Sequence, residues 1–150
     1  MYKKSIVHYI TKICVDVLFY IGILCCVLVP FSSSWLIKYF YFAEENITFM
    51  IVVLLLSGGA SVYILWELKV IFKTLLVGNP FILKNVESLR KIALASAFIS
   101  IIYLIKCLFS FTIATVVIII MFVIASLFCL TIKDLFKQAI NYKDENDLTI

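Results

Sequence analysis

Four long apolar stretches constrain this chain more than any other feature of its sequence. A helix that spans a bilayer needs about 20 mainly apolar residues, and windows of that kind lie at about residues 13–31, 48–66, 92–109 and 112–132. With 65% hydrophobic residues and a mean hydropathy of +1.16, the chain has too few polar residues to cover its apolar surface in water. We therefore predict an all-α membrane protein in which residues 1–150 form one bundle of four transmembrane helices.

The positions of the basic residues predict the orientation of these helices. Lys and Arg near the ends of membrane spans are retained on the cytoplasmic side. Of the 13 basic residues, only Lys38 and Lys106 fall toward the side that lies opposite to both chain ends. We expect a multi-pass protein of a bacterial plasma membrane with both termini in the cytoplasm. Apolar residues at helical spacing continue from Ile132 to Ile140, within a cytoplasmic tail of residues 133–150.

The segment 68–91 is the only long charged stretch inside the apolar chain. Gly78 supplies the backbone freedom that ends a helix, Pro80 with its fixed φ can start the next one, and Asn79 is a candidate cap. Glu87 and Lys91 are spaced for an i, i+4 ion pair. The segment is predicted to be a cytoplasmic helical hairpin that extends the second and third spans.

Two ionisable residues fall inside the apolar windows. An acid in a span is by default a functional candidate, but Asp16 is one turn from Lys12 and can reach the cytoplasmic interface. We predict an interfacial or helix-pairing carboxylate, with a proton or ion relay as the alternative. Lys106 is predicted to extend from the outer edge of the third span into the headgroups. The two residues would then lie at opposite faces of the membrane, so a buried ion pair between them is not expected.

Small residues cluster in the second and third windows. The runs 57–61, Ser-Gly-Gly-Ala-Ser, and 93–100, which contains three Ala and two Ser, let helix backbones approach closely. We expect the second and third spans to pack together.

No residue pattern in the sequence is typical of catalysis or metal binding. The five cysteines lie in apolar windows without neighbouring His or a CxxC spacing, which indicates reduced packing residues. No HExxH, paired-Asp or Ser-Lys arrangement falls at membrane depth. We predict no enzymatic activity, no cofactor, no metal site and no direct binding of nucleic acid. The lipid bilayer is the expected environment, and a homo-oligomer stays an open alternative.

Two short motifs resemble a known family. Gly78-Asn79-Pro80-Phe81, followed by Asn85, Leu89, Arg90 and Ile92, is similar to the Gly-x-Pro-Phe…Asn…Leu-Arg-x-Ile pattern of small four-span bacterial membrane proteins, the domain of unknown function 2975. The chain ends with a sequence that resembles that family's Glu-Asn-Asp-Leu-Thr-Ile ending: Asp144, Glu145, Asn146, Asp147, Leu148, Thr149 and Ile150. The resemblance covers essentially the whole chain and implies no activity. Members often appear beside a small helix-turn-helix regulator of the Cro/CI type, which implies a DNA-binding partner.

The charges of the two motifs suggest that they act together. The hairpin carries five cations, whereas the tail carries three acids and the terminal carboxylate against Lys143. Exposed ion pairs contribute about 0–1 kcal/mol each, so a tail docked on the hairpin could be displaced by a partner. The hairpin cations could instead hold anionic lipid headgroups at about 1 kcal/mol each.

We therefore expect a non-enzymatic regulatory protein whose hairpin and tail bind, and sequester, a cytosolic helix-turn-helix transcription factor. The alternative is a bacteriocin or toxin immunity protein, acting through the aromatic outer loop around residues 35–42 or through the small-residue spans. A transporter would require several copies to enclose a pathway.

Overall fold

The computed structural model describes residues 6–32, 47–78 and 80–148, which form four long α-helices and one short 3-10 helix. They are α1 (Ile6–Leu28), η1 (Val29–Ser32), α3 (Ile47–Val77), α4 (Leu83–Phe109) and α5 (Ile113–Leu148). No strand occurs among the described residues. All four α-helices are long and apolar enough to cross a membrane, which confirms the predicted all-α class with four spanning helices. The predicted windows lie within these segments, except that Thr112 precedes α5.

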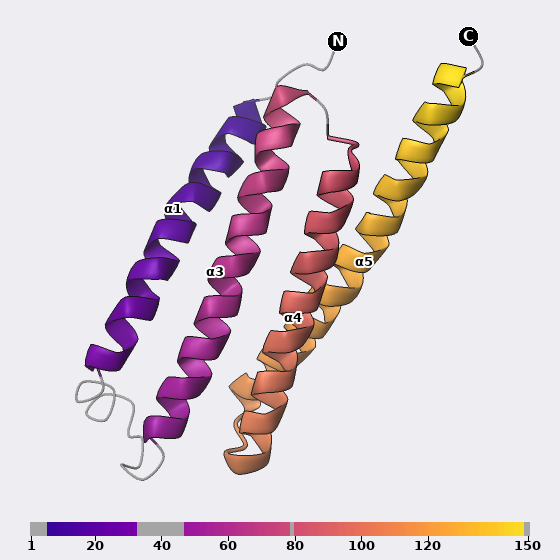
Figure 1. Cartoon of the computed structure of the whole chain (residues 1–150). Coiled ribbons are helices and arrows are strands. Elements are labelled where there is room, and N and C mark those ends of the chain that lie inside the picture. The colour runs from indigo at the N-terminus through magenta and orange to yellow at the C-terminus, as the bar shows by residue number, and fades with distance from the viewer. Residues whose placement is uncertain (1–5, 33–46, 79, 149–150) are drawn as a thin grey trace.

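The helices pack in chain order, with α1 against α3, α3 against α4, and α4 against α5 (Figure 1). Helix α4 lies between α3 and α5 and contributes most of the buried side chains in the described part of the chain. Many large apolar side chains of α1 and α5 are exposed, as expected for surfaces that face lipid. The bundle is therefore an open arrangement of consecutive helices.

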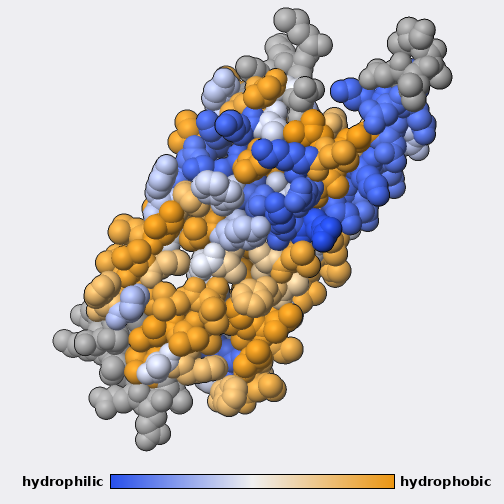
Figure 2. Space-filling model, in the orientation of Figure 1, coloured by the Kyte–Doolittle hydropathy of each residue, from blue (hydrophilic) through white to orange (hydrophobic). Residues whose placement is uncertain are grey.

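Polar side chains gather at one end of the bundle. The start of α1, the turn between α3 and α4, and the end of α5 lie at the same end (Figure 1). Figure 2 shows hydrophilic residues concentrated over this end, whereas the rest of the visible surface is largely hydrophobic. We call it the charged end.

Three helices are much longer than the hydrocarbon core of a bilayer is thick, whereas the 23 residues of α1 give only about 34 Å. At 1.5 Å per residue, the 31 residues of α3, the 27 of α4 and the 36 of α5 give lengths of about 46, 40 and 54 Å. The hydrocarbon core is about 30 Å thick. The helical continuation predicted for residues 132–140 is confirmed, since α5 runs without interruption to Leu148.

Small residues lie at two contacts between helices, of which the sequence predicts only one. The second and third spans do pack, as α3 on α4, and Ala60 and Ala95 lie in the groove between them. Gly58, however, serves the contact between α3 and α1. A Cβ atom at Gly58 would lie 2.8 Å from the Sγ atom of Cys26, whereas one at Gly59 would meet no atom within 4 Å.

Gly58→Ala is expected to lower the free energy of unfolding by about 1–2 kcal/mol relative to Gly59→Ala, because its methyl group overlaps Cys26. Equilibrium unfolding of the purified protein in mixed micelles, followed by circular dichroism, would measure the difference. Adding Cys26→Ala to Gly58→Ala should recover part of the loss. Equal stability of the two glycine variants would contradict close packing of α1 on α3 at this position.

Candidate functional site

The turn between α3 and α4 is built around the Gly-x-Pro-Phe motif. Gly78 has a positive φ of 94°, and its N–H donates to the carbonyl of Leu75 at 3.1 Å. The prediction that Gly78 ends the helix is thus confirmed. Asn79 lies outside the described residues, so its predicted capping role is not described. The residue in the cap position of α4 is Ile82, whose side chain makes no capping hydrogen bond.

Pro80 was expected to start α4, and that prediction is wrong because the helix begins at Leu83. The Pro80 carbonyl is instead an acceptor within the turn. It accepts the N–H of Ile82 at 3.2 Å and the side-chain amide of Asn85 at 2.7 Å. Since both bonds draw the chain back toward the start of α4, Pro80 belongs to the turn.

Asn85 links the two arms of the turn. Its side chain is fully buried, and its Nδ2 donates to the Pro80 carbonyl and to Oγ1 of Thr74 on α3, each at 2.7 Å. The Thr74 hydroxyl lies 2.7 Å from the Ile71 carbonyl and 2.9 Å from Asn85 Oδ1, and it can donate to either. This network explains why Asn85 lies five residues after Pro80, since at that spacing its side chain reaches back to the Pro80 carbonyl. Thr74 was missed in the sequence because it lies among apolar residues and belongs to no motif.

The rest of the motif divides between core and surface. Leu89 and Ile92 are buried, whereas Arg90 is exposed. The ring of Phe81 packs against Phe136 of α5, with 5.1 Å between centroids. This aromatic pair joins the turn to the part of α5 that follows the predicted fourth span.

A groove of about 290 Å³ lies between the start of α4 and the part of α5 that follows the predicted fourth span. It is lined by Leu83, Val86, Glu87, Arg90, Lys133, Asp134 and Lys137. Leu83 is 69% exposed although it is large and apolar. The groove therefore combines charges of both signs with exposed apolar surface.

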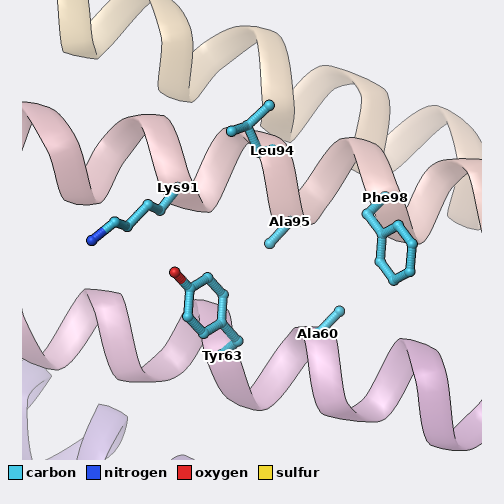
Figure 3. Close-up of a pocket in the computed structure, with 6 residues that line it drawn as sticks. All are labelled: Ala60, Tyr63, Lys91, Leu94, Ala95 and Phe98. Carbon is cyan, nitrogen blue, oxygen red and sulfur yellow. The ribbon is translucent and has the colours of Figure 1, made fainter.

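Glu67 on α3 is a buried carboxylate that the sequence analysis did not single out. Only 8% of its side chain is exposed, and its Oε1 lies 3.7 Å from Nζ of Lys91 on α4. Lys91 also pairs with Glu87 at 3.2 Å, as the spacing predicted. Lys91 and Tyr63 point toward one another at the mouth of a largely apolar groove between α3 and α4 (Figure 3). The sequence offered only its position just after the second apolar window, which does not reveal that Glu67 is buried.

Asp16 pairs two helices, as predicted. Its Oδ1 lies 3.1 Å from Nζ of Lys69 on α3. That ammonium also lies over the ring of Phe19, 4.5 Å from the centroid. At the opposite end of the bundle, Lys106 donates to Oγ1 of the buried Thr115 at 3.0 Å. Asp16 and Lys106 thus have different partners, in agreement with their predicted separation.

The acidic end of the chain forms the last described turns of α5. Asp144 is exposed, and in Figure 1 these turns stand apart from the turn between α3 and α4. Thr149 and Ile150 lie outside the described residues. Docking of this tail on the hairpin stays a prediction.

The described residues include no group of three His, Cys, Asp or Glu side chains that could hold a metal ion. All five cysteines are free thiols. What the charged end offers is ion pairs, an anchored turn and exposed apolar side chains, an assembly suited to binding.

A family model described as "Protein of unknown function (DUF2975)" matches residues 8–150. No curated protein and no solved structure matches the chain.

Proposed function

Because the chain belongs to this family of proteins of unknown function, we propose a function from its own structure: it is a non-enzymatic plasma-membrane protein that holds a small cytosolic helix-turn-helix transcription factor at the membrane. The binding surface is the charged end, formed by the turn between α3 and α4 together with the end of α5. The observation that carries the proposal is the length of α5.

A helix of 36 residues is about 54 Å long, which exceeds the hydrocarbon core by about 24 Å. Because the predicted fourth span ends near Ile132, the excess lies at the charged end. Leu135 is 57% exposed and Tyr142 is 67% exposed on this part of α5. Large apolar side chains that are exposed to water rather than lipid are typical of surfaces that bind other proteins.

The charge of the charged end supports a cytosolic position and a charged partner. Basic residues near span ends are retained in the cytoplasm, and Lys84, Arg90, Lys133 and Lys137 all belong to this end. Asp144, Glu145 and Asp147 follow at the tip of α5. A helix-turn-helix protein presents a basic face to DNA phosphates. We infer that the acidic tip occupies that face and so competes with DNA.

Co-purification tests the proposal directly. A helix-turn-helix regulator of the Cro/CI type, if one is encoded beside the gene, should be recovered with the full-length protein from solubilised membranes, and an operator duplex should release it. In cells, deleting the membrane protein should move the regulator into the soluble fraction. A regulator that is equally soluble with and without the membrane protein would contradict the proposal.

The orientation can be tested separately. A reporter that is active only in the cytoplasm, fused after Ile150, is expected to be active, because the positive-inside rule places that end inside the cell. A reporter that is active only outside the cell should be silent at the same position. The reverse result would place the charged end outside and exclude a cytosolic partner.

The immunity alternative depends on the aromatic loop, which lies outside the described residues, or on the small-residue spans. It predicts that deleting the gene changes sensitivity to co-encoded peptides while transcription from the regulator's target promoters stays unchanged. The opposite pattern is expected for a protein that sequesters a transcription factor.

A further inference from the structure

A cavity of about 450 Å³ lies between α1 and α3 at the charged end. It is lined by Lys12, Asp16, Trp66, Lys69, Val70 and Lys73. Residues four apart share a helix face, so Lys12 and Asp16 project from one face of α1, and Lys69 and Lys73 from one face of α3. The two pairs meet across the cavity.

The charges around this cavity are not balanced. Lys69 is neutralised by Asp16 at 3.1 Å. Among the described residues, no carboxylate lies within 4.0 Å of the ammonium group of Lys12 or Lys73. Three lysines against one carboxylate leave two positive charges around one cavity. Because like charges repel, a bound anion would stabilise this arrangement, and the half-buried Lys12 and exposed Lys73 leave the two charges accessible to it.

The cavity also contains a hydrogen-bond acceptor, the carboxylate of Asp16. The Oδ1 atom of Asp16 is buried and makes no hydrogen bond in the described structure, although it lies within ion-pair distance of Lys69. Since 32% of the Asp16 side chain is nevertheless exposed, a ligand that carried a hydroxyl group next to its negative charge could donate a hydrogen bond to this carboxylate.

The location of the cavity identifies the source of such a ligand. Trp66 lies at its edge, is 54% exposed and contacts Phe19 at 5.8 Å between ring centroids. Trp is enriched at the level of lipid headgroups. Trp66 also ends the second predicted span, and basic pockets between transmembrane helices at this level bind anionic headgroups.

We propose that the cavity between α1 and α3 binds the headgroup of an anionic phospholipid. The phosphate lies between Lys12 and Lys73, and a headgroup hydroxyl donates to the exposed part of the Asp16 carboxylate. Phosphatidylglycerol carries both groups, whereas phosphatidylcholine carries no net charge and no hydroxyl. The proposal does not depend on a regulator partner or on which side of the membrane the charged end occupies.

Quenching of Trp66 by brominated lipid would test this inference. Full-length Trp35→Phe protein, purified in an uncharged detergent, leaves Trp66 as the only tryptophan. Brominated phosphatidylglycerol is expected to quench it at concentrations at least tenfold lower than brominated phosphatidylcholine. Lys12→Gln with Lys73→Gln should weaken the phosphatidylglycerol interaction about fivefold per lysine, the factor that corresponds to about 1 kcal/mol each.

Matched variants separate this site from a general surface charge. Lys133→Gln with Lys137→Gln removes the same charge from the α4–α5 groove. It should change the concentration of brominated phosphatidylglycerol at half-maximal quenching less than twofold. Lys12→Arg with Lys73→Arg should retain binding, which distinguishes lost charge from lost folding. Equal quenching by the two lipids, or equal losses in both glutamine variants, would overturn the proposal. Inorganic phosphate and unbrominated phosphatidylglycerol can each be added as a competitor of the brominated lipid. If both displace it at the same concentration, the site binds free phosphate instead.

Discussion

Asn85→Ala is expected to lower the free energy of unfolding by about 2–3 kcal/mol. The substitution removes the bonds of a fully buried amide to the Pro80 carbonyl and to Thr74 Oγ1, and it leaves a cavity between the two arms. Because Pro80 still accepts the Ile82 N–H and Thr74 can still donate to Ile71, the partners keep some of their hydrogen bonds. Equilibrium unfolding in mixed micelles would measure the loss.

Thr74→Val separates the two bonds of Asn85. It removes the hydroxyl partner but keeps the bond from Asn85 to Pro80, so the expected loss is about 1 kcal/mol. Gln138→Ala, at an exposed position on α5, serves as a control and should change stability by less than about 0.5 kcal/mol. An Asn85→Ala variant that is as stable as Gln138→Ala would show that the motif is not needed to hold the turn.

Removal of residues 144–150 is expected to weaken binding of the helix-turn-helix regulator by about tenfold, which corresponds to about three exposed ion pairs of 0.5 kcal/mol each. The reason is that the acidic tip of α5 is proposed to contact the basic DNA-binding face. Titration of labelled regulator with protein in discs of uncharged lipid would give the dissociation constants. The difference between full-length and shortened protein should decrease at high salt, because salt screens exposed charges.

A matched pair of double substitutions controls for charge alone. Asp144→Asn with Glu145→Gln should weaken binding about fivefold, from two such pairs. Glu44→Gln with Glu45→Gln removes the same charge on the side predicted to be extracellular and should have no effect. If removing residues 144–150 instead strengthened binding, the tail would cover the hairpin in the free protein and compete with the regulator, contrary to the arrangement proposed here.

Much of the architecture could be predicted from the sequence because lipid leaves few choices. Every backbone polar group of a span must be paired internally, so an apolar stretch of sufficient length becomes a helix. The same argument applied to residues 132–140, where helical spacing continued, and α5 does extend through them. Asp16 was recognisable as a helix-pairing residue because an acid near a span end requires a partner. Its partner Lys69 could not be identified from the sequence, because the residue of α3 that faces Asp16 depends on the axial position of α1 relative to α3.

The errors concern contacts that depend on several elements at once. Pro80 was expected to begin α4 because proline favours the first turn of a helix, yet its carbonyl is held by Asn85 and the helix begins three residues later. Gly58 was considered with the third span, but Cys26 of α1 lies against it. Glu67 was passed over because burial of a residue just beyond an apolar window cannot be read from its neighbours in the chain.

The sequence by itself determined the fold class, the four helices, the segregation of charge and the family, because apolar length, charge position and short motifs are local properties of the chain. Only the tertiary structure decided that Asn85 joins Pro80 to Thr74, that Glu67 is buried beside Lys91, and that Lys12 and Lys73 share a cavity with Asp16. The physical reason is that these relations depend on the rotation and axial position of each helix. Those are set by the packing of side chains from separate parts of the chain.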